Sequence, residues 1–319
     1  MASIPEDAIP PPPMAAAPAR TLRRTVCRHT LPLRIMHWIN AICLLVLLGS
    51  GLQIFNAHPA LYWGQRSNFE RPWLHLGAVR APDGKLHGVT TLGSRRFDTT
   101  GVLGLSKLDG RPTVRGFPAW ATIPGPQWLA MGRAWHFFFA WLFVINGALF
   151  VAYALWTRHL ARDLVPTRGD WRGIGRSIRD HALLRHPRGE EAARYNVLQR
   201  IAYLVVIFGF GGGVVLMGLA MSPRMDSVLG WLVDAVGGRQ SARSIHFLIA
   251  MGFVAFFLVH IFEVIVTGLG NNLRSIITGR YAIEEDPGQP AAPADPLVAA
   301  PRADLVREEA AEPPHGGRS

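Results

Sequence analysis

The chain has 319 residues, of which 49% are hydrophobic and 17% charged, and its formal net charge is +11. The apolar residues form long blocks, and neither Cys27 nor Cys43 belongs to a closely spaced Cys or His ligand pattern. This arrangement argues against a disulfide framework, an iron–sulfur cluster and covalently attached haem.

Four apolar blocks are each long enough to cross a membrane: 35–55, 134–156, 201–221 and 245–269. About 20 apolar residues span roughly 30 Å of hydrocarbon at about 1.5 Å rise per residue, and a bilayer admits only helices or closed barrels. We therefore predict an all-α membrane protein, a four-transmembrane-helix bundle with a long outer loop and disordered tails.

The distribution of arginine predicts the orientation of this bundle. The connection 157–197 carries nine Arg, whereas the connection 222–244 carries three. Basic loops stay in the cytoplasm, so we place 157–197 and both termini there, with the first span as its own signal anchor. The loop 57–133 holds ten Lys or Arg, but long loops are translocated regardless of charge. The positive net charge is thus interpreted as membrane topology and not as nucleic-acid binding.

The chain divides into a membrane domain, 30–282, and two Pro- and Ala-rich tails, 1–29 and 283–319, whose composition predicts disorder. The outer loop 57–133 contains four Trp in a Gly- and Pro-rich run. We predict a small folded cap there, which serves either as a lid over the helix ends or as a docking surface for a partner. Helical spacing of apolar residues at 228–236 predicts a short helix on the outer membrane surface.

Four of the twelve histidines lie inside the predicted spans: His37, His136, His246 and His260. His246 and His260 are fourteen residues apart, which is close to four helical turns, so they share a face about 21 Å apart along the axis. The predicted orientation puts His136 beside His246 at the outer level and His37 beside His260 at the inner level. Depth therefore predicts two pairs of facing imidazoles.

Two imidazoles from facing helices are the axial ligands of a b-type haem iron, in a slot that apolar helices keep dry. Arg34, Arg133 and Arg243 each precede one of these histidines by three residues. Each Arg thus lies one turn nearer the membrane surface, where it can pair with a haem propionate. Alternatively, each His only makes an interhelical hydrogen bond. Zinc or copper transport would favour further carboxylate, thiolate or His ligands close together.

The sequence resembles a known family in the segments "RIMHW", "RAWHFFFAWLF", "RYNVLQRIAYL" and "RSIHF" with "LVHIF". They are similar to the di-haem cytochrome b subunits of bacterial formate dehydrogenases, nickel-iron hydrogenases and thiosulfate reductases, the bacterial cytochrome b561 group. The thiosulfate reductase branch is indicated by "GLQIFNAHPALYWG", "GFPAWATIP" and "GGRQSARSIHF". The resemblance covers roughly residues 30–281, and the long first outer loop departs from the formate dehydrogenase and hydrogenase members.

The resemblance implies a multi-pass protein of the bacterial inner membrane with two b-type haems. It implies electron exchange between membrane quinone and a periplasmic catalytic subunit, often a molybdopterin enzyme. Formate dehydrogenase subunits carry a Tyr-Asn-x-x-Gln element near their inner haem and quinone, which corresponds here to Asn196 and Gln199. An amide there can hydrogen-bond a quinone carbonyl, and Glu263, three residues after His260, can relay a proton. The alternatives are an N-cap role for Asn196 and an interfacial Arg partner for Glu263.

We therefore predict an electron-transfer subunit of a respiratory complex, in which no side chain makes or breaks bonds apart from quinone protonation. One alternative is a stand-alone quinone-linked cytochrome b oxidoreductase, in which a small oxidant or reductant meets the outer haem directly. The other is a non-redox metal or solute carrier that uses the intramembrane histidines. A reduced-minus-oxidised visible spectrum of isolated membranes separates haem binding from the carrier.

Overall fold

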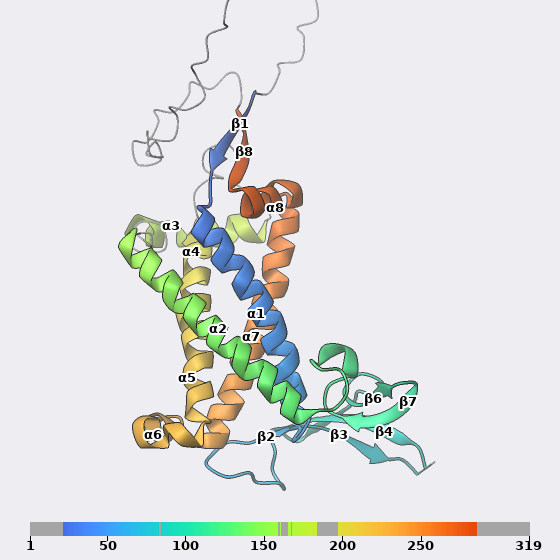
Figure 1. Ribbon diagram of the computed structural model, residues 1–319. Helices are drawn as coiled ribbons and strands as arrows, with labels where there is room; N and C mark the ends of the chain where they lie inside the picture. The colour runs from blue at the N-terminus through green and yellow to red at the C-terminus, as the bar shows by residue number, and fades with distance from the viewer. Residues whose placement is uncertain are drawn as a thin grey trace, which may run out of the picture. The chain divides into compact units, whose positions relative to one another are not determined.

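The computed structural model of the protein describes residues 22–82, 84–158, 160, 165–166, 168–183 and 197–285 (Figure 1). The chain divides into two units, and the unit Thr25–Tyr281 contains all four long helices. These helices are long and apolar enough to cross a membrane, which confirms the predicted four-helix membrane fold. They are α1 (Leu31–Phe55), α2 (Leu129–Trp156), the continuous α4 (Val197–Leu204), η4 (Val205–Gly212) and α5 (Gly213–Ala220), and α7 (Arg239–Val266).

The helices begin a few residues before the predicted apolar blocks, because their first two turns carry polar and charged residues. α2 and α7, for example, include Arg133 and Arg243. Large apolar side chains such as Leu45, Trp141 and Leu258 are more than half exposed on the bundle surface. Hydrocarbon is as apolar as these side chains, so such exposure is the expected exterior of a membrane bundle.

Small and polar residues hold the helices together, as in other membrane bundles. Between α1 and α2, the buried Asn146 donates from Nδ2 to the Met36 carbonyl at 2.9 Å and to Asn40 Oδ1 at 2.8 Å. Between the third span and α7, a Cβ on Gly252 would lie 2.9 Å from the Phe210 ring. The two helices approach closely at this point because Gly252 has no side chain.

The middle of the third span is a π-helix rather than an α-helix, which the sequence analysis did not predict. This segment, η4, reads VVIFGFGG and follows α4 without a break. The segment contains three β-branched residues and three glycines, which all have lower α-helix propensity than leucine or alanine.

Residues 57–128 form a lobe of short strands, which we call the strand lobe. One antiparallel sheet has the order β2-β3-β4-β5 and the second pairs β6 with β7. Leu61 and Leu76 of the lobe are buried against Phe55 at the end of α1, which joins the lobe to the bundle. The elements are β2 (Ala60–Leu61), β3 (Leu74–Arg80), β4 (Leu86–Leu92), β5 (Arg95–Asp98), β6 (Gly104–Leu108), β7 (Arg111–Arg115) and the 3-10 turn η1 (Ala119–Ala121).

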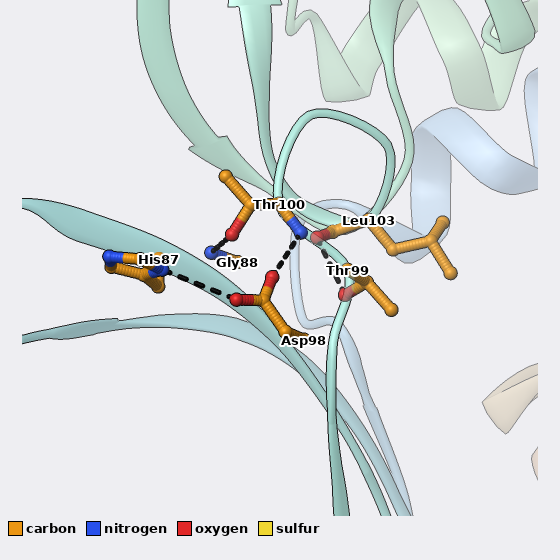
Figure 2. A network of polar contacts seen from close by, with 6 residues as sticks. All are labelled: His87, Gly88, Asp98, Thr99, Thr100 and Leu103. Carbon is orange, nitrogen blue, oxygen red and sulfur yellow. Dashed lines mark hydrogen bonds and ion pairs between the residues drawn. The ribbon is translucent and has the colours of Figure 1, made fainter.

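A polar network fixes the end of β5 against β4 (Figure 2). Asp98 accepts hydrogen bonds from the Thr100 amide at 2.9 Å and lies 3.3 Å from His87 Nδ1. Thr100 Oγ1 in turn accepts the Gly88 amide at 2.9 Å. The bonds from Thr100, and then the His87 ring, lower the pKa of the Asp98 carboxyl to about 2. The network lies on the surface of the lobe and orders the corner between its two sheets.

Three short helices complete the described chain. α6 (Asp226–Ala235), preceded by η5 (Pro223–Met225), occupies the segment where a short helix was predicted. Its Leu232 and Val233 are buried, whereas Val228 and Trp231 are about two-thirds exposed. The other two helices are α3 (Arg168–Ala182) and α8 (Leu269–Thr278).

The predicted disorder of the tails is wrong next to the membrane domain. β1 (Leu22–Cys27) pairs with β8 (Arg280–Glu285), so ordered backbone extends into both segments predicted to be disordered, 1–29 and 283–319. Inter-strand hydrogen bonds between the two ends of the chain supply an order that composition alone does not indicate. Residues 1–21 and 286–319 lie outside the described residues.

Candidate functional site

One pair of histidines faces across the bundle at the end that carries the strand lobe, which we call the lobe end. His136 lies in the second turn of α2 and His246 in the second turn of α7. Their ring centres are 6.3 Å apart with an interplanar angle of 58°. Both rings are only partly exposed. The structure thus brings together the two histidines that were predicted to share the outer level.

Hydrogen bonds to Nδ1 orient both rings of the lobe-end pair. His246 Nδ1 lies 2.9 Å from the Val214 carbonyl, which can only accept, so this nitrogen carries the proton. His136 Nδ1 lies 3.1 Å from Ser50 Oγ, whose own proton is donated to the Val46 carbonyl at 2.6 Å. We infer that Ser50 accepts from His136. In both rings the bare nitrogen is therefore Nε2, the arrangement found in metal-ligating histidines.

A second pair lies at the other end of the bundle, which we call the tail end. His37 in α1 and His260 in α7 have ring centres 6.4 Å apart and an interplanar angle of 54°. The Trp38 ring meets His37 edge-on at 5.5 Å, and the Phe256 ring stacks on His260 at 5.7 Å. Among the described residues, these two aromatic rings contact the imidazoles, and neither imidazole makes a hydrogen bond.

The spacing within each pair matches that of two imidazoles on one metal. A ligating ring nitrogen lies about 2.0 Å from its metal, and with roughly 1.1 Å from nitrogen to ring centre this places two ring centres about 6 Å apart. The observed separations are 6.3 Å and 6.4 Å. The residues therefore fit the two axial ligands of a haem iron at both ends of the bundle. Their role as ligands stays a prediction.

Two glycines lie beside the lobe-end rings, and the sequence analysis missed both. A Cβ on Gly51 would lie 3.4 Å from Cε1 of His136, and one on Gly218 would lie 3.5 Å from Cε1 of His246. A signal for the first exists in the sequence. Gly51 follows His37 by fourteen residues, the interval that also separates His246 from His260. On α1 a glycine thus occupies the level that a histidine occupies on α7.

The three arginines predicted to pair with haem propionates differ in their surroundings. Arg243 donates from Nη2 to the His58 carbonyl at 2.7 Å and lies over the Phe55 ring, between the lobe and the histidine pair. Arg133 is exposed and lies over its own helix neighbour Phe137. Arg34 donates to the Ile277 carbonyl at the end of α8. Each lies one turn from its histidine, and propionate binding stays a prediction.

The predicted quinone residues are only partly described. Gln199 lies in the first turn of α4 and Glu263 one turn beyond His260 in α7, and both are partly exposed. Asn196 lies outside the described residues.

Membrane-spanning helices with imidazoles paired across the bundle are the features of an integral membrane haem protein. The sequence profile of the prokaryotic cytochrome b561 family matches residues 110–279, slightly more than half of the chain. This match includes α2, the third span and α7, and it leaves α1 with His37 outside.

A curated relative is YedZ1 of Azospira oryzae, which carries the provisional description of a protein-methionine-sulfoxide reductase subunit. It is 31% identical over 134 residues, which cover 42% of this chain and 65% of YedZ1. The chain thus spans slightly less than two thirds of this relative. No solved structure matches.

The chain belongs to the prokaryotic cytochrome b561 family. It is an integral membrane protein of a family that binds haem b, and the predicted resemblance to this family is confirmed.

Proposed function

We propose that the protein holds two b haems, one between His136 and His246 and one between His37 and His260. The observation that carries this proposal is the separation of 6.3 Å and 6.4 Å between the paired ring centres. Haem, when bound, supplies one-electron chemistry at its iron. The imidazoles contribute the axial nitrogens, and Ser50 and the Val214 carbonyl keep the lobe-end rings turned toward each other.

The two pairs connect opposite ends of the bundle. His246 and His260 are separated by fourteen residues of one helix, or about 21 Å along its axis. α7 is therefore the common element that carries one ligand of each pair. We place the lobe end outside the cytoplasm and the tail end inside it, in the bacterial inner membrane, because 157–197 carries nine Arg.

The proposed electron path runs between a partner at the lobe end and quinone at the tail end. The partner is a periplasmic oxidoreductase subunit, which we propose contains molybdopterin. The description of YedZ1 as a subunit of a reductase supports a separate catalytic subunit. At the tail end, Asn196 and Gln199 supply amides for a quinone carbonyl, and Glu263 supplies the proton that quinone reduction takes up.

Four single substitutions test the ligand pairs. His136→Ala and His246→Ala should each halve the haem content of the purified protein and remove the same spectral component. His37→Ala and His260→Ala should each remove the other component. Haem is quantified after extraction, and electron paramagnetic resonance separates the two ferric centres. Full haem content in any of the four folded, membrane-inserted variants contradicts that ligand, and loss of both haems from all four contradicts the pairing.

The quinone site is tested with Asn196→Leu and Glu263→Gln in protein that retains both haems. We expect slowed reoxidation of the reduced tail-end haem by added quinone in both variants, while reduction at the lobe end stays normal. Unchanged rates in both variants contradict the site.

A further inference from the structure

The strand lobe carries an aromatic surface beside the lobe-end histidine pair. The connection between β2 and β3 lies beyond the ends of the helices in Figure 1 and contains Trp63 and Phe69. The Phe69 side chain is 75% exposed and the Trp63 side chain 55%. Phe69 lines a pocket of about 170 Å³. We call Trp63, Phe69 and this pocket, lined by His58, Pro59, Ala60, Tyr62, Phe69, Pro72 and His75, the aromatic face.

The aromatic face is internally packed, so its shape is preformed. The Phe69 ring meets the His58 ring edge-on at 5.6 Å and the Tyr62 ring at 6.1 Å. His58 Nε2 and the Tyr62 hydroxyl lie 3.2 Å apart. Trp63 stacks on Trp73 at 5.8 Å with an interplanar angle of 20°. Rigid exposed aromatic rings around a small pocket have the composition of interface hot spots.

Backbone bonds fasten this face to the first turn of α7. The Gly64 carbonyl accepts the amides of Gln240 at 3.0 Å and Ser241 at 3.2 Å. The Gly64 amide donates to Ser241 Oγ at 2.8 Å. The Gln65 side chain accepts the Arg239 amide at 2.8 Å. The free amides at the start of this helix are therefore satisfied by the residues that follow Trp63.

Side-chain bonds continue the attachment toward the histidine. Trp73 Nε1 donates to Oγ of the fully buried Ser244 at 2.9 Å, and Ser244 Oγ donates to the Tyr62 carbonyl at 2.6 Å. Arg243 donates to the His58 carbonyl at 2.7 Å. Ser244 precedes His246 by two residues, or about 3 Å along the helix axis, so the aromatic face is attached to α7 close to the level of the lobe-end pair.

The basic residues around the aromatic face favour a partner with an acidic surface. Residues 57–133 contain ten Lys or Arg and four Asp or Glu. Arg66 and Arg71 flank Phe69 in the β2–β3 connection and are exposed, as is Glu70 between them, so the connection carries a net charge of +1. A basic rim around an aromatic centre attracts a surface rich in Asp and Glu, which raises the rate of encounter and orients the partner.

We propose that the aromatic face is the docking site of an acidic redox protein that exchanges electrons with the lobe-end haem. An apolar side chain of the partner enters the pocket beside Phe69, and carboxylates of the partner lie against Arg66 and Arg71. One electron passes between the partner's cofactor and the haem iron, and no proton moves. The assignment of the redox step rests on the proposed function, whereas the binding surface is testable without it.

The test uses the full chain in lipid nanodiscs and a reduced plant-type ferredoxin, which is an acidic one-electron donor, as the probe. Binding is measured by surface plasmon resonance, and electron entry by stopped-flow reduction of the ferric haems. Phe69→Asp places a negative charge at the centre of the face, and the double variant Arg66→Glu, Arg71→Glu reverses its rim. We expect each to weaken binding at least tenfold and to slow haem reduction in proportion.

Phe97→Asp is the matched control, since Phe97 is a 48% exposed ring on β5 of the same lobe. It should bind and accept electrons like the unsubstituted protein. Dithionite, a small donor that needs no docking, should reduce the haems of all variants equally. Raising the salt concentration should weaken ferredoxin binding to the unsubstituted protein.

Two results overturn the proposal. One is equal ferredoxin affinity in Phe69→Asp and the unsubstituted protein, which would make the exposed ring a lipid contact. The other is equal weakening by Phe97→Asp, which would mean that the whole lobe attracts anions without a defined site. If the unsubstituted protein contains no haem, the proposed function is contradicted. The docking proposal remains testable in that case, because ferredoxin binding to the aromatic face is measured without haem.

Discussion

Gly51 of α1 lies against the imidazole of His136 in α2, so that a Cβ at this glycine would stand 3.4 Å from the ring. A larger side chain at residue 51 must therefore push the ring out of line with His246. We expect Gly51→Leu to remove the lobe-end haem and to leave the tail-end haem in place, as measured by haem content and electron paramagnetic resonance. Gly147→Leu is the control, because a Cβ at Gly147 in α2 meets no atom within 4 Å. If Gly51→Leu retains both haems, the His136 ring does not need the space that the absent side chain of Gly51 leaves.

The hydrogen bond between Ser50 and His136 gives a second prediction. Removing a group that orients a metal-ligating histidine typically costs about 10–100-fold in affinity. We expect Ser50→Ala to lower the affinity for the lobe-end haem within that range, measured by transfer of haem to apomyoglobin. The tail-end haem of the same molecule is the internal reference. Equal loss rates of the lobe-end haem from Ser50→Ala and the unsubstituted protein would contradict the role of this hydroxyl.

Membrane orientation is tested by reporters placed where the structure tolerates them. Gly110 lies in the turn between β6 and β7, where a Cβ meets no atom within 4 Å, and is therefore suited to an insertion. We expect alkaline phosphatase inserted at Gly110 to be active, because it is exported, and green fluorescent protein fused after Glu285 to fluoresce, because it stays in the cytoplasm. The reverse pattern would exchange the outer and inner assignments of the two histidine pairs.

Arg115 is a buried cation inside the strand lobe, and its Nη2 also lies 3.5 Å from Gln53 Oε1 of α1. It is 2% exposed and donates to the carbonyls of Phe117 and Gly125 and to Thr122 Oγ1 at 2.6, 3.1 and 2.9 Å. Burial lowers the pKa of its guanidinium. We expect Arg115→Gln to destabilise the protein by about 2–4 kcal/mol, since it leaves several buried acceptors unsatisfied. Thermal unfolding in detergent measures the loss.

The control for this substitution lies on the same strand. Arg111→Gln removes an exposed guanidinium from β7, and we expect its effect to stay within about 0.5 kcal/mol. Equal stability of the two variants would show that the bonds of Arg115 do not hold the lobe in place.

Stability of the strand lobe should depend on pH through His58. Burial, then the positive charge of Arg243 and the ring of His75, lower the pKa of His58 below its ordinary value of 6.5. The folded state thus favours the neutral ring, and the unfolded state takes up a proton first as the pH falls below about 6.5. We expect the unfolding temperature to fall between pH 7.5 and 5.5, and His58→Gln to reduce this fall. An identical fall in His58→Gln would assign the dependence to other groups.

The helices and the histidine pairs were predictable because a bilayer simplifies the problem. Length and polarity locate the spans, and the regular rise of a helix then fixes the depth of each residue. His37 and His260 come from spans more than two hundred positions apart in the chain, yet their depth alone brings them together.

The strand lobe and the environment of the histidines were not predictable in the same way. The alternating segment from Leu74 to Arg80 signals a strand, but its register against β4 depends on packing with Leu61 and Phe55. The bond from Arg243 to the His58 carbonyl depends on the same fold. The pairing of β1 with β8 was not predictable from composition, because the backbone of a partner strand can order a segment that has few apolar residues.

The two histidine pairs differ in what lies behind their rings. At the lobe end, acceptors at Nδ1 push electron density toward Nε2 of both rings. With haem bound as proposed, this would stabilise ferric iron and lower the midpoint potential. At the tail end, the rings of Trp38 and Phe256 contact His37 and His260, and neither imidazole makes a hydrogen bond to a described residue. We expect the lobe-end centre to have the lower midpoint potential in a redox titration. With the lower potential at the lobe end, the step from the lobe-end haem to the tail-end haem would be energetically downhill, whereas the potentials of the external donor and acceptor would still set the net direction of electron flow.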